Sequence, residues 1–149
     1  VGTCVYIVEN EMVFSYLMEQ VQGKYVSLLC TSGQPRYAAL KLISLIVQSG
    51  IPIYYSGDLD PDGIGIADRL WQRFGNRIQF FGMSPEDYRN SLSKEVFGEN
   101  GRKKLEHIWH PLLRETAELV RKTGKAGYQE NTLKELSEKL VGCDQNQNL

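Results

Sequence analysis

Acidic side chains are concentrated in two short segments, each directly after an apolar run. Glu9 and Glu11 follow the first run, and Asp58, Asp60 and Asp62 follow a later one at alternate positions. Two unit charges about 4 Å apart repel by about 4 kcal/mol at an effective dielectric near 20. Carboxylates that are brought together must therefore take up protons or bind a cation. Because no Cys or His accompanies these oxygens, we expect that cation to be Mg²⁺, with Mn²⁺ able to substitute.

A third polar segment, Thr31–Arg36, follows another apolar run. Ser32, Gln34 and Arg36 are candidates for binding a phosphate, because Pro35 is a good first residue for a helix. The N-terminus of a helix offers free N–H groups and a positive dipole end, and Arg36 adds a guanidinium group. A structural turn, with Arg36 solvated or paired with an acid, explains the same residues equally well.

Short apolar runs alternate with segments of helical period over the first 92 residues. The predicted strands are Thr3–Val8, Tyr25–Cys30, Ile51–Tyr55 and Arg77–Phe81, and helices are expected to begin near Asn10, Pro35, Pro61 and Ser84. This alternation predicts an α/β fold in which a parallel four-stranded sheet is sandwiched by helices. If the first and third strands are neighbours, their ends lie about 5 Å apart. Glu9, Asp58, Asp60 and Asp62 would then share one small volume.

The pattern changes beyond about residue 93. A polar connection is predicted over Ser93–Gly101, followed by a long amphipathic helix whose apolar positions run from Leu105 to Val120. A short helix is expected over Thr132–Val141, and Cys143–Leu149 is a polar tail. We therefore expect an α/β core over residues 1–92 and a C-terminal helical extension of the same domain over residues 93–149.

Other interpretations of the acidic motif are weaker. The spacing of Asp58, Asp60, Asp62 and Gly63 matches the start of an EF-hand loop, but Arg69 stands where that loop needs a bidentate glutamate. A phosphatase of the haloacid-dehalogenase type remains a minor alternative. Its DxD motif would lie on the first strand of the core, whereas the motif here follows the third predicted strand. A purely structural role is available to Asp60, which precedes Pro61 as a helix N-cap does. For His107 and His110, packing or surface roles are favoured over catalysis, because no acid partner is evident.

Two of these motifs resemble those of a known domain. Val8-Glu9-Asn10-Glu11-Met12-Val13-Phe14 resembles the first motif of a Toprim domain, and Ser56-Gly57-Asp58-Leu59-Asp60-Pro61-Asp62-Gly63 resembles its DxD motif. The DxDPxG form is similar to that in the A subunit of topoisomerase VI. Together with Thr31–Arg36, the stretch from Thr3 to Tyr88 is most similar to the C-terminal Toprim domain of the nuclease subunit in Wadjet-type plasmid defence, which is associated with SMC-like complexes.

The resemblance implies a function and its residues. Glu9, Asp58 and Asp60 would be the catalytic, Mg²⁺-binding acids, with Asp62 a further ligand and Glu11 an auxiliary one. The implied activity is cleavage of DNA by one part of a larger bacterial anti-plasmid protein. Its implied partners are DNA, subunits of an SMC-like, condensin-type complex, an N-terminal region of the same protein and a second copy in a homodimer. Hydrolysis and tyrosine transesterification both remain open, and a non-catalytic module that binds phosphates or partners is the alternative.

Composition is that of an ordinary globular protein. The 149 residues are 42% hydrophobic and 23% charged, and 17 basic against 18 acidic residues give a net charge of −1. That balance provides little attraction to DNA, so other parts of its protein would supply much of the grip. The longest apolar run is too short to cross a bilayer, and Cys4, Cys30 and Cys143 form no CxxC pair. We expect a cytoplasmic protein without membrane contact, and we expect this sequence, which begins at Val1, to be a C-terminal piece.

Overall fold

A parallel four-stranded sheet forms the centre of the molecule. The computed structural model describes residues 4–144, with side chains described up to residue 140. The strands are β1 (Val5–Val8), β2 (Ser27–Cys30), β3 (Ile53–Ser56) and β4 (Ile78–Phe80), in the order β2-β1-β3-β4. All three neighbouring pairs are parallel, and β1 pairs with both β2 and β3. The predicted α/β class and parallel sheet are confirmed, although each strand is shorter than its apolar run.

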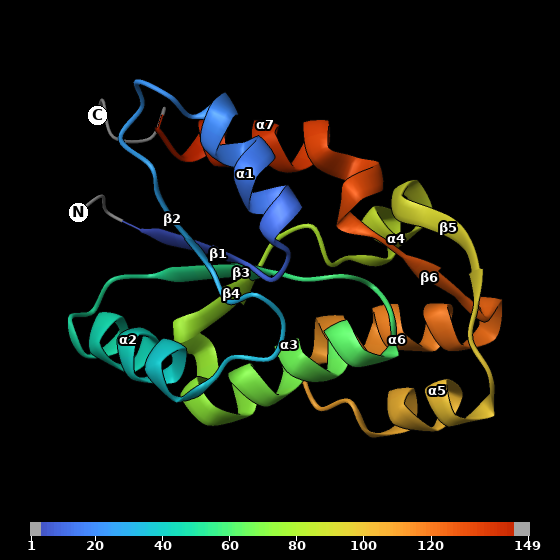
Figure 1. Cartoon of the computed structure of the whole chain (residues 1–149). Helices are drawn as coiled ribbons and strands as arrows, with labels where there is room; N and C mark the ends of the chain where they lie inside the picture. The colour runs from blue at the N-terminus through green and yellow to red at the C-terminus, as the bar shows by residue number, and fades with distance from the viewer. Residues whose placement is uncertain (1–3, 145–149) are drawn as a thin grey trace.

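Helices cover both faces of this sheet (Figure 1). On one face lie α1 (Glu11–Gln20) and α7 (Leu133–Asp144), and on the other lie α2 (Tyr37–Gln48), α3 (Pro61–Phe74) and α6 (Pro111–Thr123). Local signals in the sequence set several of these starts. The Asn10 side chain accepts hydrogen bonds from Met12 N and Val13 N at the start of α1, and Pro61 occupies the first turn of α3.

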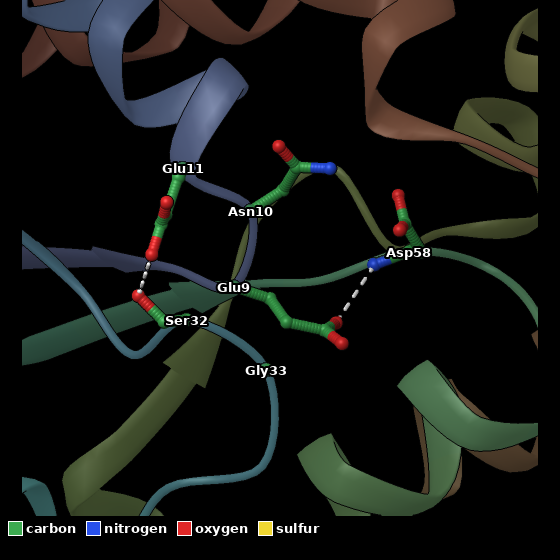
Figure 2. Close-up of a pocket in the computed structure, with 6 residues that line it drawn as sticks. All are labelled: Glu9, Asn10, Glu11, Ser32, Gly33 and Asp58. Atoms are coloured by element: carbon green, nitrogen blue, oxygen red, sulfur yellow. Dashed lines mark hydrogen bonds between the residues drawn. The ribbon is translucent and has the colours of Figure 1, made fainter.

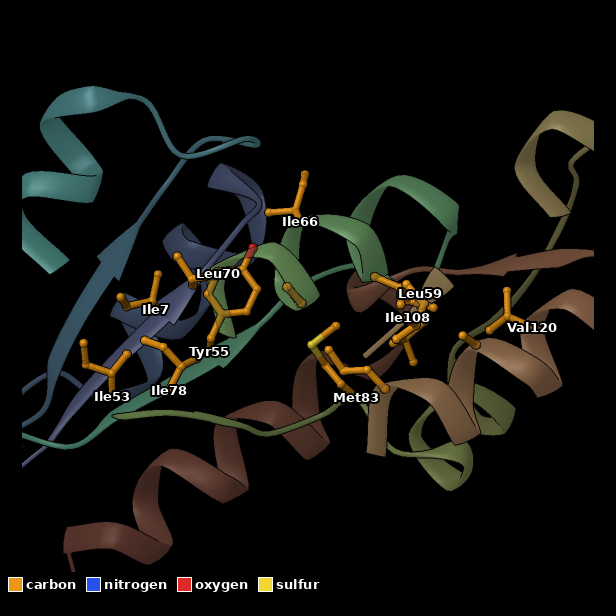
Figure 3. Close-up of a cluster of buried hydrophobic side chains, with 14 of the residues drawn as sticks. Ile7, Ile53, Tyr55, Leu59, Ile66, Leu70, Ile78, Met83, Ile108 and Val120 are labelled. Atoms are coloured by element: carbon orange, nitrogen blue, oxygen red, sulfur yellow. The ribbon is translucent and has the colours of Figure 1, made fainter. Parts of the chain in front are cut away.

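Two apolar clusters hold the layers together. Along β1, Val5 and Ile7 pack into the cluster that faces α2 and α3, and Tyr6 and Val8 pack into the one that faces α1 and α7. Figure 3 shows side chains of the first cluster, which extends from the sheet through α3 to Ile108 and Val120. Residues on both sides of the boundary predicted at residue 92 therefore belong to the same core.

The segment after residue 91 differs from the prediction. In place of a polar connection there are β5 (Leu92–Val96) and α5 (Glu99–Lys104), and β5 pairs antiparallel with β6 (Lys125–Gly127). The remaining short elements are η1 (Gly75–Arg77), α4 (Pro85–Ser91), η2 (Leu105–His107) and η3 (Gln129–Thr132). The C-terminal extension is thus mainly helical and also contains a small second sheet.

The long helix predicted from Leu105 to Val120 is wrong in its first part. Residues 105–107 form a single 3₁₀ turn, and α6 begins only at Pro111. The physical reason is Asp68 on α3, which is 2% exposed. Its carboxylate accepts hydrogen bonds from Trp109 N at 3.0 Å and His110 N at 2.8 Å, and this fixes the backbone in a non-helical turn.

Two helices expose apolar residues that a helical period alone would place against the core. Met12 on α1 and Leu42 on α2 are 54% and 44% exposed. In α1, burial is confined to the narrower stripe of Val13 and Leu17. Within residues 4–144, no helix has both the length and the apolar character needed to cross a membrane.

Candidate functional site

The topology brings Glu9 and Asp58 to one edge of the sheet. β1 and β3 lie side by side with Val8 opposite Ser56, so the residues that follow these two strands emerge together. The Glu9 backbone N–H donates to Ser56 O at 3.3 Å, and its carboxylate Oε2 accepts from Asp58 N, also at 3.3 Å. Two acids that are far apart in the sequence are therefore in direct contact.

A hollow of about 340 Å³ opens beside them (Figure 2). Its walls come from three loops that follow β1, β2 and β3, and the lining residues are Glu9, Asn10, Glu11, Ser32, Gly33 and Asp58. In Figure 2 the Glu9 side chain extends toward the Asp58 backbone, whereas the Asp58 carboxylate is directed away from it. The polar side chains at the hollow are thus three carboxylates, one amide and one hydroxyl group.

Burial and mutual repulsion change the acidity of this site. Burial, followed by the charge of Asp58, raises the pKa of Glu9 from 4.5 to about 7, although the hydrogen bond from Asp58 N opposes the shift. Burial likewise raises the pKa of Asp58 from 3.8 to about 6, with Asp60 and Glu130 adding to the rise. Burial also raises the pKa of Asp60. Ionising these groups together is unfavourable, which is the condition under which carboxylates gain from a cation.

These shifts predict that stability falls as pH rises. A carboxyl group with a raised pKa holds its proton more tightly in the folded state, so folding loses free energy between the unfolded and folded pKa values. For Glu9 that window runs from 4.5 to about 7. Without divalent metal at about pH 8, we expect Glu9→Gln to be more stable than the parent chain and to unfold at a higher temperature. The gain in the free energy of unfolding should be on the order of 1–2 kcal/mol after allowance for solvent screening.

At about pH 4 the two proteins should be equally stable, because Glu9 is then mostly protonated in both the folded and the unfolded state. The measurement is thermal unfolding across this pH range. The matched control is Glu19→Gln on the exposed surface of α1. A stability difference that does not vary with pH would contradict this electrostatic account.

The C-terminal segment contacts Asp58 and positions its carboxylate. The sequence did not indicate this contact. Asp58 Oδ1 accepts a hydrogen bond from Gln129 N at 2.9 Å, and Gln129 Nε2 donates to Ser56 Oγ at 2.9 Å. Leu59 and Gly127 exchange two backbone hydrogen bonds beside this contact. Because 71 residues separate Gln129 from Asp58 and no motif marks it, only the fold places Gln129 at the site.

Asn10 and Glu130 were also missed as site residues. Asn10 was expected only as a helix cap, but its side chain also lines the hollow and donates to Glu130 Oε1 at 3.3 Å. Glu130 adds a negative charge near Asp58. The acidic character of the site therefore extends into the segment that follows β6.

Asp60 and Asp62 do not line this hollow. Asp60 accepts from Gly63 N at 2.7 Å as the N-cap of α3, and Asp62 forms an exposed ion pair with Lys104 at 2.7 Å. Asp60 nevertheless lies near enough for its charge to raise the pKa of both Glu9 and Asp58. Gly63 permits this tight turn, because a Cβ atom there would lie 2.2 Å from Asp58 O.

In the loop after β2, Ser32 lies inside the hollow, and Gln34 and Arg36 lie outside it. Ser32 has a positive φ of 52°, and its hydroxyl donates to Glu11 Oε1 at 2.6 Å inside the hollow. Gln34 lies outside, where its Oε1 accepts from Arg69 Nη2 at 2.9 Å. Arg36 is exposed and precedes α2 without capping it through its side chain. The structure thus places one of the three predicted phosphate-binding residues, Ser32, against the acids.

A bound Mg²⁺ would find the carboxylates of Glu9 and Asp58 at the hollow, with Glu11 as a third acid in its wall. Within residues 4–144, no three His, Cys, Asp or Glu side chains are grouped so as to hold a metal ion, so the four acids do not converge as they stand. Glu9 and Asp58 do share one hollow, and burial first and neighbouring carboxylates second raise the pKa of both and disfavour their charged forms. Mg²⁺ is commonly held by one or two carboxylates, with water and substrate phosphates as further ligands. The donor set fits this ion, provided that the Asp58 carboxylate turns away from Gln129.

The histidines take no part in the hollow. His107 is exposed, and the His110 ring packs edge-on against Trp71 and Phe80 with centroids 4.9 Å from each. Burial lowers the pKa of His110. The packing role expected for His110 agrees with these contacts.

The fold and the site define an α/β protein with an acidic hollow at the carboxyl ends of neighbouring parallel strands. The family described as "Protein of unknown function C-terminus (DUF2399)" matches residues 1–140. Because the match covers nearly all of the chain, the chain belongs to this family. A comparison with curated proteins found no match.

Proposed function

We propose that this chain is a Toprim-type domain that cleaves DNA with the help of Mg²⁺, with Mn²⁺ as a substitute. The observation that carries the proposal is the contact between Glu9 Oε2 and Asp58 N at the ends of adjacent parallel strands. Two carboxylates in one hollow are a common arrangement for phosphoryl chemistry, since they can hold a hard cation beside a phosphate. The order of the strands supports the resemblance of the two acidic motifs to those of Toprim domains.

Each residue has a distinct part in this proposal. Glu9 and Asp58 would hold the cation, and Asp60 supports them from the N-terminus of α3. Mg²⁺, when bound, would polarise the scissile phosphodiester as a Lewis acid. Ser32 lines the same hollow and would donate its hydroxyl to a phosphate oxygen after releasing its hydrogen bond to Glu11 Oε1. Gln129 positions Asp58 through its backbone N–H.

The finer parts of the proposal rest on the resemblance. We infer that the domain belongs to a cytoplasmic, Wadjet-type anti-plasmid protein and works with an N-terminal region of that protein and SMC-like subunits. A net charge of −1 agrees with this division of labour, because a DNA-cleaving domain without basic excess needs other surfaces to hold the duplex. We also propose that the domain forms a homodimer.

The test is nicking of supercoiled plasmid by a large molar excess of the chain. We expect nicked circles to accumulate in Mg²⁺ or Mn²⁺ and not in EDTA. The reaction should be slow, since the chain has few basic side chains available to bind the DNA phosphate backbone. If the chain binds DNA in Mg²⁺ but leaves the plasmid intact in every metal, the non-catalytic phosphate-binding module is the correct interpretation. The hydrogen bond from Gln129 N, which holds the Asp58 carboxylate away from that of Glu9, is the observation that favours this alternative.

A further inference from the structure

A second cavity, on the other side of the loop after β2, has the opposite charge. This groove of about 430 Å³ lies between α2 and α3, a size within the range of about 300–1,000 Å³ that is usual for small-molecule sites. Leu40, Ile66 and Leu70 give it an apolar floor. Arg69 and Arg73 also line it, and no acidic residue does.

Both arginines are available to an anion. Their side chains are exposed, and neither forms an ion pair within the described part of the chain. Arg69 Nη2 donates to Gln34 Oε1 at 2.9 Å, which fixes its position and leaves further N–H groups free. The Arg73 guanidinium lies over the Phe74 ring at 5.6 Å from its centroid. Two positioned guanidinium groups above an apolar floor are complementary to a phosphate joined to a flat, weakly polar group.

One loop forms a wall of both cavities. Ser32 and Gly33 line the acidic hollow, and the next two residues, Gln34 and Pro35, line the groove. A polymer of regularly spaced phosphates could therefore cross this loop and contact both cavities at once. A lone anion would gain nothing from that adjacency.

We propose that the groove between α2 and α3 binds a nucleotide of the DNA strand that enters the acidic hollow. Arg69 and Arg73 contact its phosphate, and its sugar and base lie against Leu40, Ile66 and Leu70. The side chains of Gln34 and Gln72, which also line the groove, provide hydrogen-bonding groups for the base. The groove would thereby fix the strand next to the site of cleavage. This inference rests on the proposed function, because it places the same substrate.

The test measures binding of a short, fluorescent single-stranded thymidine oligonucleotide by anisotropy, in EDTA and over a range of NaCl concentrations. Arg73→Gln is the informative variant, since Arg73 is exposed and the only polar or ring contact of its side chain in the described part of the chain is with the Phe74 ring. We expect its Kd to be about three- to tenfold higher than that of the parent, and its salt slope to be smaller by about 0.7, the value for one lost phosphate contact on a single strand. The matched control is Arg89→Gln on α4, outside both cavities.

Equal Kd values and equal salt slopes for Arg73→Gln and Arg89→Gln would overturn the inference. Because EDTA prevents metal-dependent cleavage, this result is independent of the nicking assay. If the parent chain nicks plasmid but Arg73→Gln binds the oligonucleotide like Arg89→Gln, the proposed function stands and the binding groove is rejected. If the parent chain does not nick plasmid but Arg73→Gln alone shows weaker binding and a smaller salt slope, the binding groove stands and the proposed function is rejected.

Discussion

Asp68→Ala should lower the free energy of unfolding by about 3 kcal/mol. The Asp68 carboxylate is 2% exposed and accepts from Trp109 N, His110 N and Gln72 Nε2. Removal of this acceptor leaves two partly buried backbone N–H groups unsatisfied, and each such group costs about 1–3 kcal/mol. Domains of this size are commonly stable by only about 5–15 kcal/mol, so a lower unfolding temperature, by roughly 10 °C, is expected.

The measurement is denaturant or thermal unfolding of three proteins. Asp62→Ala is the control, because Asp62 lies on the same helix and forms an exposed ion pair with Lys104, worth about 0–1 kcal/mol. Asp68→Asn keeps one acceptor oxygen and should fall between the two. A loss in Asp68→Ala no larger than that in Asp62→Ala would show that the turn before α6 is held by something else.

The same residue explains one of the main failures of sequence-based prediction. The helical period from Leu105 to Val120 correctly marks Leu105, Ile108, Leu112 and Val120 as buried or half-buried. Trp109, which belongs to the same predicted stripe, is instead 65% exposed. The break before Pro111 depends on a carboxylate 41 residues away. Periodicity records which side chains face the core, whereas a tertiary hydrogen bond decides whether the backbone between them is helical.

The parallel sheet was predictable because its signals are local. Apolar β-branched runs at β1 and β3, Asn10 as a cap and Pro61 in a first turn all act within a few residues. The meeting of Glu9 and Asp58 then followed from one further assumption, that their strands are neighbours, and the pairing of β1 with β3 agrees with it.

The environment of these acids was not predictable to the same degree. Gln129 contacts both Asp58 and Ser56, yet neither its residue type nor its spacing is distinctive. The sequence also did not indicate that Asp62 would pair with Lys104. Such contacts depend on where β6 and α5 pack, and those elements lie in the segment that was expected to be a connection and a helix.

Glu9→Gln should separate stability from activity. At about pH 8 this variant should be more stable than the parent without metal, because it removes a crowded charge. Its rate of Mg²⁺-dependent nicking should nevertheless fall by at least about 100-fold, the usual scale for loss of an essential acidic group. Asp58→Asn should lose activity to a similar extent, since Asp58 lines the same hollow. A folding defect would lower stability and activity together, so the opposite signs identify a functional role.

The decisive measurement is the single-turnover rate of plasmid nicking in Mg²⁺ by the parent chain, Glu9→Gln and the matched Glu19→Gln, each at the same protein excess. We expect nicking by the parent and by Glu19→Gln at rates within about twofold, and a rate at least about 100-fold lower for Glu9→Gln. Nicking by Glu9→Gln at the rate of the parent would contradict a catalytic site at the Glu9–Asp58 hollow.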